Sequence, residues 1–280
     1  MVIVWLIGFW GFAGFVPPPD PNLSGVEIKA LFSEHTTLLR VGLLLTGLSS
    51  ALLGPYIAVI TMQMRRIEGA LSTLSYVQLS LGALLIIEFI IPVMILQAAA
   101  FRPDISPDVI RSMNDVAWLM FVGIVSTAAL QILAIGVAIL RDHGKAPVFP
   151  RWGGYFCIWA GLLIVPGGLC VLFKTGPFAW NGIYAWWIGL VVFVGWLAGM
   201  TRLLLLAVRH QERHGPASGP EQELLQTVQR FQTQLEELRR QTADQPQADA
   251  VTADTKPRHG DTRGLPSGAA RSMHVEAEEG

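Results

Sequence analysis

The chain has 280 residues, of which 52% are hydrophobic and 15% charged, whereas about 25% of the residues of a typical soluble domain are charged. The charges are divided unevenly, because residues 1–208 hold 20 charged side chains and residues 209–280 hold 21. This composition excludes an ordinary soluble globule. The net charge of −1 lacks the basic character that nucleic-acid binding requires, so we expect no nucleic-acid partner.

Six apolar stretches approach or reach the roughly 20 residues that a helix needs to cross a bilayer. They cover about 1–16, 38–62, 76–100, 116–140, 152–173 and 180–208. The first stretch is short and runs into Pro17, but no Lys or Arg precedes it and no small-residue cleavage site follows it, so we interpret it as a span and not as a signal peptide. The sequence predicts an all-α, polytopic membrane helix bundle of about six transmembrane helices over residues 1–208.

The loops between these stretches differ in positive charge. Those on one side carry eight Lys and Arg residues, and those on the other side carry five. Because Lys and Arg are enriched in cytoplasmic loops, both termini are expected in the cytoplasm. Two of the external loops contain helix-start patterns: Ser24 stands three residues before Glu27, as in a capping box, and Ser106 is followed by Pro107.

Four loop segments together resemble a known group of proteins. They read MRRIEG at 64–69, AAAFRP at 98–103, PVFPRW at 147–152 and FKTGPFAWNG at 173–182. As a set, these segments resemble an uncharacterised family of multi-span inner-membrane proteins of actinobacteria and some proteobacteria, to which no activity is assigned. The resemblance implies a multi-pass protein of the bacterial cytoplasmic (inner) membrane, and it implies no functional residue.

Glu88 is the one acidic side chain in the middle of a predicted span. A charge at that depth costs about 2.5–3.5 kcal/mol on insertion scales, so the side chain must face protein or water, or stay protonated. Counting residues from the span ends places Gln131 and Ser50 at a similar depth. We therefore predict an intramembrane polar layer of Glu88, Gln131 and Ser50, either as a protonatable site or as interhelical glue in which a protonated Glu88 bonds Gln131.

A second candidate site is the external turn around Lys174, Trp180 and Asn181, which is rich in aromatic residues. These side chains could line the mouth of a ligand site. The alternative is the aromatic belt of a membrane interface, with Lys174 extending to the headgroups.

Motifs of common enzyme and cofactor sites are absent from the sequence. It contains no GxGxxG, Walker loop, HExxH or GxSxG, and its six His residues lie outside the predicted spans. Cys157 and Cys170 have no nearby partner ligands, so we interpret them as buried apolar residues. We therefore predict no catalytic residue, no cofactor and no metal.

The C-terminal region changes character. Within residues 209–241, the segment 221–241 reads as a cytoplasmic amphipathic helix in which apolar residues recur at the four- and three-residue spacings of a coiled-coil seam. The seam consists of Leu224, Val228, Phe231, Leu235 and Leu238. A surface helix lying on loops or headgroups is the alternative. Residues 242–280 are rich in small and polar residues and are expected to be disordered.

The sequence leaves three hypotheses for the function. The first is a non-enzymatic accessory or scaffold subunit of the membrane, which self-associates or binds a membrane-complex partner through the 221–241 helix or through a close-packing Gly195 and Gly199 pair. The second is a small transporter or hydrophobic-ligand-binding protein that uses Glu88. A membrane enzyme is the third and weakest.

Overall fold

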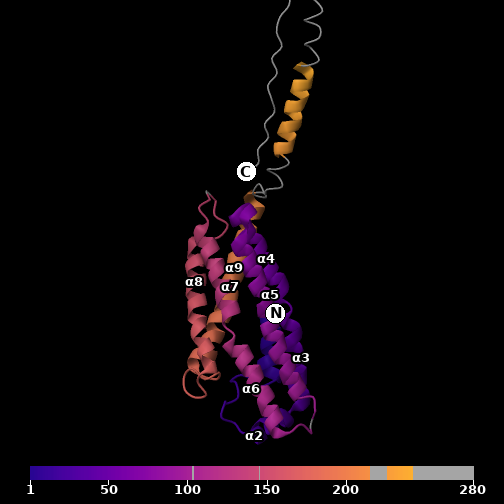
Figure 1. Ribbon diagram of the computed structural model, residues 1–280, viewed down its shortest axis with the longest axis vertical. Coiled ribbons are helices and arrows are strands. Elements are labelled where there is room, and N and C mark those ends of the chain that lie inside the picture. Colours follow the sequence, from indigo (N-terminus) through magenta and orange to yellow (C-terminus); the bar gives the residue numbers. More distant parts are fainter. Residues whose placement is uncertain (103, 145, 215–225, 242–280) are drawn as a thin grey trace, which may run out of the picture. The chain divides into compact units, whose positions relative to one another are not determined.

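The computed structural model describes residues 1–102, 104–144, 146–214 and 226–241. The chain divides into two compact units, Met1–Gln222 and Glu223–Gly280. The described residues of the first unit form an all-helical bundle (Figure 1). Its elements are α1 Val2–Leu6, η1 Ile7–Phe12, α2 Gly25–Glu34, α3 Thr36–Ser50, α4 Leu53–Glu68, η2 Gly69–Leu71, α5 Thr73–Ala99, α6 Pro107–Gly123, α7 Ser126–Arg141, α8 Arg151–Ile164, η3 Val165–Val171, η4 Ile183–Ile188 and α9 Gly189–His214.

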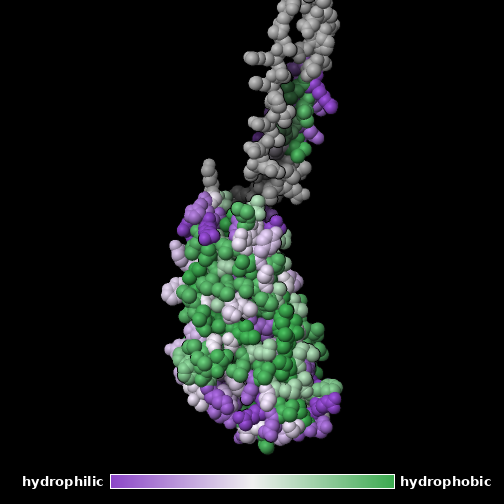
Figure 2. Space-filling view, in the orientation of Figure 1, coloured by the Kyte–Doolittle hydropathy of each residue, from purple (hydrophilic) through white to green (hydrophobic). Residues whose placement is uncertain are grey.

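Five helical stretches are long and apolar enough to cross a membrane. They are Thr36–Leu71, Thr73–Ala99, Pro107–Arg141, Arg151–Val171 and Ile183–Arg209. Figure 2 shows the matching surface, on which apolar side chains form a broad band and hydrophilic side chains gather at the ends of the bundle. The predicted class, an all-α polytopic membrane bundle, is confirmed.

The first apolar stretch is shorter than predicted. The helical segment Val2–Phe12 is roughly 17 Å long, about half of a hydrocarbon core of ~30 Å. It ends where Gly14 takes a positive φ of 68°, ahead of the three consecutive prolines. In Figure 1 the N-terminal end lies partway along the bundle, so the expected first span over 1–16 is replaced by a helix that reaches only the middle of the bundle.

Helix starts follow the capping patterns in the sequence. The Ser24 side chain accepts a hydrogen bond from the Glu27 backbone, and the Glu27 carboxylate accepts one from the Ser24 backbone, which completes a capping box at α2. Ser106 caps α6, with Pro107 in the first turn. Both predicted helix starts are confirmed. At α5 the cap comes from further away, because the Glu68 carboxylate accepts hydrogen bonds from the backbone N–H groups of Leu74 and Ser75.

Small residues let several helices pack closely. A methyl group added at Gly42 of α3 would lie 2.4 Å from the carbonyl oxygen of Gly8 in η1. The first helix therefore packs closely against α3 at Gly8, whereas Gly11 has open space beside it. Cys157 and Cys170 are both buried and unpaired with each other, as expected for apolar packing residues.

The buried side chains form two separate apolar clusters. The first includes Phe9, Phe32 and Trp118, and the second includes Ile60, Ile135 and Met200. Phe89, partly buried on α5, packs against both clusters. The bundle thus has two cores along its length, and the layer between them contains the candidate site.

Candidate ligand cavity

Glu88 lies near the middle of α5, in the layer between the two cores. Its side chain is half-buried, and its carboxylate oxygen accepts a hydrogen bond from the Thr127 hydroxyl of α7. This bond links α5 to α7, two helices that pack directly against each other. Thr127 follows the break between α6 and α7 by two residues, so the polar contact stands at the start of a helix.

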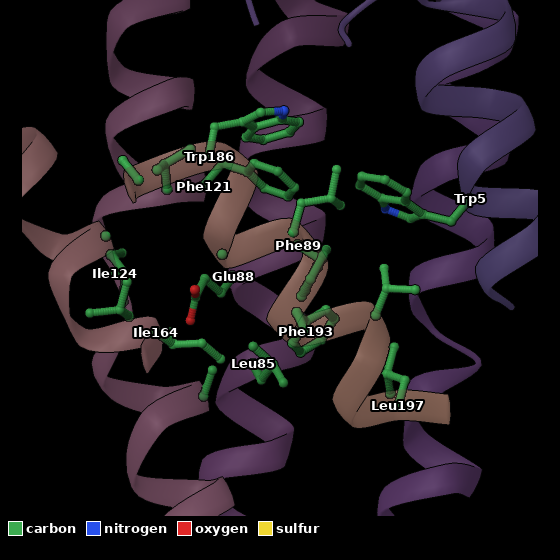
Figure 3. Close-up of a pocket in the computed structure, with 18 of the residues that line it drawn as sticks. Trp5, Leu85, Glu88, Phe89, Phe121, Ile124, Ile164, Trp186, Phe193 and Leu197 are labelled. Atoms are coloured by element: carbon green, nitrogen blue, oxygen red, sulfur yellow. The ribbon is translucent and has the colours of Figure 1, made fainter. Parts of the chain in front are cut away.

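Glu88 lines a cavity of about 120 Å³. Figure 3 shows the carboxyl group pointing into a space bounded by Leu85, Ile124 and Ile164, with the rings of Phe121 and Trp186 on another side. The remaining lining is almost entirely apolar and comes mainly from α1, α5, α6, α7, η3, η4 and α9. These lining residues are Met1, Val2, Trp5, Leu6, Phe89, Val122, Val125, Ala128, Gly167, Ala185, Gly189, Leu190, Phe193, Val194 and Leu197.

Several helix irregularities converge on this cavity. Ile124 leaves helical geometry with ψ 78°, and it lines the cavity together with Val125. Gly167 lies in the 3-10 segment that follows α8, and Trp186 lies in the π-helical turn before α9. Irregular backbone at membrane depth is tolerated where protein or an internal cavity covers it. Discontinuous helices around an internal site are also how many membrane transporters build their binding sites.

Two further polar groups at the cavity lack partners. The indole N–H groups of Trp5 and Trp186 are buried, and within the described residues neither has a hydrogen-bond acceptor. Trp5 stacks on Phe9 with ring centroids 4.6 Å apart, and Trp186 lies 5.6 Å from Trp118. The aromatic rings are therefore held in place by their neighbours. Apart from the aromatic content, no sequence signal marks this cluster, because its members come from distant parts of the chain.

Hydrogen bonds do not link Glu88, Gln131 and Ser50 to one another in the described residues. Gln131 is 1% exposed, and neither of its amide atoms has a hydrogen-bond partner in the described part of the chain, so the expected bond to Glu88 is not made. Ser50 donates to the Thr46 carbonyl of its own helix, 2.8 Å away. Thr127, one helical turn before Gln131, takes the role assigned to Gln131.

A different polar contact was missed by sequence reasoning. The Thr61 hydroxyl of α4 donates to the Gln78 side-chain oxygen of α5 over 2.6 Å, and both residues are buried. Gln131 lies close to this contact along the helices, since its amide nitrogen is 2.9 Å from the position of a methyl group added at Gly82. The presence of Thr and Gln inside two consecutive apolar stretches was the available signal.

The turn around Lys174, Trp180 and Asn181 separates into two environments. Trp180 is buried, and its indole N–H donates to the Pro19 carbonyl over 2.8 Å. Lys174 is exposed and Asn181 is partly exposed. Phe178 stacks on Tyr184 with centroids 5.0 Å apart. Trp180 therefore anchors the loop that follows the first helix, whereas Lys174 and Asn181 take no part in that hydrogen bond.

In the second unit, residues 226–241 are helical. The seam residues Val228, Phe231, Leu235 and Leu238 are exposed on this helix. Leu224 and the predicted disordered tail 242–280 lie outside the described residues.

Among the described residues, no group of three or more His, Cys, Asp or Glu side chains is placed to hold a metal ion. No family model, no curated protein and no solved structure matches the chain.

Proposed function

We propose that the protein binds an apolar molecule with one polar group inside the membrane, and that the polar group pairs with Glu88. The observation that carries this proposal is a carboxyl group facing an apolar cavity at the point where three helix irregularities meet. Ligand sites are mostly apolar and contain a few polar groups that fix the ligand's orientation.

The energetics favour a ligand site over interhelical glue. An ionised carboxylate in mid-membrane costs about 2.5–3.5 kcal/mol, and one hydrogen bond returns only about 0.5–1.5 kcal/mol. A neutral amide would accept the same bond from Thr127 at a smaller insertion cost. A ligand that donates a hydrogen bond or carries a positive charge would use the remaining capacity of the carboxylate.

The cavity limits the size of the bound group. An internal cavity of about 150 Å³ in another protein accommodates benzene, and the cavity here measures about 120 Å³. We therefore propose that the buried part of the ligand is one ring or a few methylene groups. A longer ligand would extend toward the lipid beside α1.

A pair of simple probes tests this chemistry. Benzylamine and toluene share a ring of suitable size, and only benzylamine carries a cationic group for Glu88. We expect benzylamine, and not toluene, to raise the unfolding temperature of the purified protein in detergent. Glu88→Gln should keep the fold, because the amide oxygen accepts from Thr127, and should remove the benzylamine effect.

Two glycines on α9 provide matched variants. Gly189 lines the cavity, Gly195 is exposed, and a methyl group added at either position meets no atom within 4 Å. Gly189→Leu should fill the cavity and abolish binding, whereas Gly195→Leu should bind like the wild type. Equal benzylamine stabilisation of the wild type and Gly189→Leu, or none in the wild type, would refute the proposal.

A second candidate function rests on the helix at 226–241. The side chains of Phe231 and Leu235 are 61% and 59% exposed, which favours an accessory or scaffold role through self-association or a membrane-complex partner. Leu235→Asp should then abolish cross-linked species in native membranes, whereas Gln229→Asp, off the seam, should not. Unchanged cross-linking in Leu235→Asp would exclude this helix as the assembly element.

We also propose that the membrane is the bacterial cytoplasmic membrane and that the C-terminal end of α9 faces the cytoplasm. The N-terminal end was expected on the same side, but it lies partway along the bundle (Figure 1). The excess of Lys and Arg on one set of loops supports this orientation, and the resemblance to the uncharacterised inner-membrane family supports the location. Reporter fusions in the loops around Gly144 and Gly176 should report the cytoplasmic and the external side, respectively. The opposite pattern would invert the topology.

A further inference from the structure

A second hollow lies on the outer surface of the bundle, away from the Glu88 cavity. It is a groove of about 710 Å³ between α3 and α5, near the chain segment that leads into α6. It shares no residue with the Glu88 cavity. Its lining consists of Thr37, Arg40, Val41, Leu44, Met94, Gln97, Ala98, Phe101 and Arg102.

The polar end of the groove carries two guanidinium groups. The Arg40 guanidinium stands over the Phe101 ring, 5.3 Å from its centroid, and the Gln97 amide donates to the Arg40 carbonyl over 2.9 Å. These contacts position Arg40 and leave its N–H groups available. No described carboxylate forms an ion pair with Arg40 or Arg102, so the positive charge of this end is not neutralised within that part of the protein.

The groove becomes apolar toward the middle of the bundle. α3 runs inward from Arg40 to Leu44, and α5 runs outward from Met94 to its end just before Arg102. Leu44 is one helical turn deeper than Arg40, and Met94 stands eight residues before Arg102; the side chains of Leu44 and Met94 are 54% and 60% exposed. The groove therefore has a cationic end at the edge of the apolar band and an apolar strip within that band.

We propose that this groove binds an anionic phospholipid. The lipid phosphate lies between Arg40 and Arg102, where guanidinium groups offer paired hydrogen-bond donors to phosphate oxygens, and one acyl chain follows Leu44 and Met94. Basic pockets between transmembrane helices bind anionic headgroups on the cytoplasmic side of membranes, and this groove offers the same chemistry on the opposite side of the proposed topology. The bound lipid bridges α3 and α5 and so stabilises the bundle.

The test measures which lipids stay on the protein. Protein purified in mild detergent and incubated with equal amounts of phosphatidylglycerol and phosphatidylcholine is examined by native mass spectrometry. We expect the wild type to retain phosphatidylglycerol preferentially. Arg40→Gln and Arg102→Gln should each weaken retention about fivefold, the factor that corresponds to the loss of one basic residue near an anionic lipid. Arg111→Gln, which removes a positive charge outside the groove, should retain lipid like the wild type.

A measurement on the wild type alone tests the proposal even if the variants fail to fold. Phosphatidylglycerol should raise the unfolding temperature of delipidated protein, whereas phosphatidylcholine and inorganic phosphate should not. The proposal is overturned if both lipids stabilise equally, if inorganic phosphate reproduces the effect, or if Arg40→Gln and Arg111→Gln retain phosphatidylglycerol equally.

Discussion

Replacing Gln131 with Leu should stabilise the protein. The side chain is 1% exposed, and neither amide atom has a hydrogen-bond partner among the described residues. A buried polar group without a partner costs about 1–3 kcal/mol, and Leu has a similar volume without that cost. Because polar groups in the unfolded, membrane-bound state also find partners, we expect a gain at the lower end, about 1–2 kcal/mol.

The free energy of unfolding can be measured by titration with sodium dodecyl sulfate in mixed micelles. Gln78→Leu is the matched control, since Gln78 is equally buried and its amide nitrogen also lacks a partner among the described residues, but its side-chain oxygen accepts a hydrogen bond from Thr61. This control should be less stable than Gln131→Leu by about 1 kcal/mol, because it removes a formed bond as well as an unpaired group. If Gln131→Leu is no more stable than Gln78→Leu, Gln131 has a partner in the membrane, and the reasoning is refuted.

Three other changes have defined outcomes. Thr127→Val removes the donor to Glu88 and should cost about 1–2 kcal/mol in the same titration; stability equal to that of the wild type would show that the bond contributes nothing. Gly42→Ala places a methyl group 2.4 Å from a backbone oxygen and should cost about 1–3 kcal/mol, whereas Gly11→Ala, with open space, should be tolerated. The capping hydrogen bonds at α2 lower the pKa of Glu27. The stabilisation that they give to the folded state is therefore complete above the ordinary glutamate pKa of ~4.3, and it is lost as the pH falls through the lowered pKa of Glu27 in the folded protein. An NMR titration that gives Glu27 an ordinary pKa would contradict this.

Local signals in the sequence predicted helix starts well. Ser24 with Glu27 and Ser106 with Pro107 act within one helical turn, so their geometry depends on adjacent residues alone. Apolar length likewise predicted the five long stretches, because the bilayer sets a length that can be counted along the chain.

The predicted hydrogen-bond partner of Glu88, Gln131, lies on the same face of α7 as the observed partner, Thr127, but one helical turn away. Thr127 and Gln131 are four residues apart, so they lie on the same face of α7. Depth counting assumed a straight span, but α6 ends at Gly123 and α7 begins at Ser126. No proline marks this break in the sequence, and the break changes which turn of α7 faces Glu88. The cavity itself depends on the convergence of distant segments and had no local signature.

The layer around Glu88 has a mechanical consequence. The α3–α4 break falls at this level too, since Gly47 faces Val93 and Gly54 faces Ile86 on α5. Near this layer α5 runs through as one uninterrupted α-helix, while its neighbours change helix type or direction. α5 is therefore the continuous helix that links the two cores, and Pro92, which lies inside it, is the position where this helix bends most easily. Bending of one core relative to the other would concentrate at Pro92, one helical turn from Glu88, and would change the shape of the cavity.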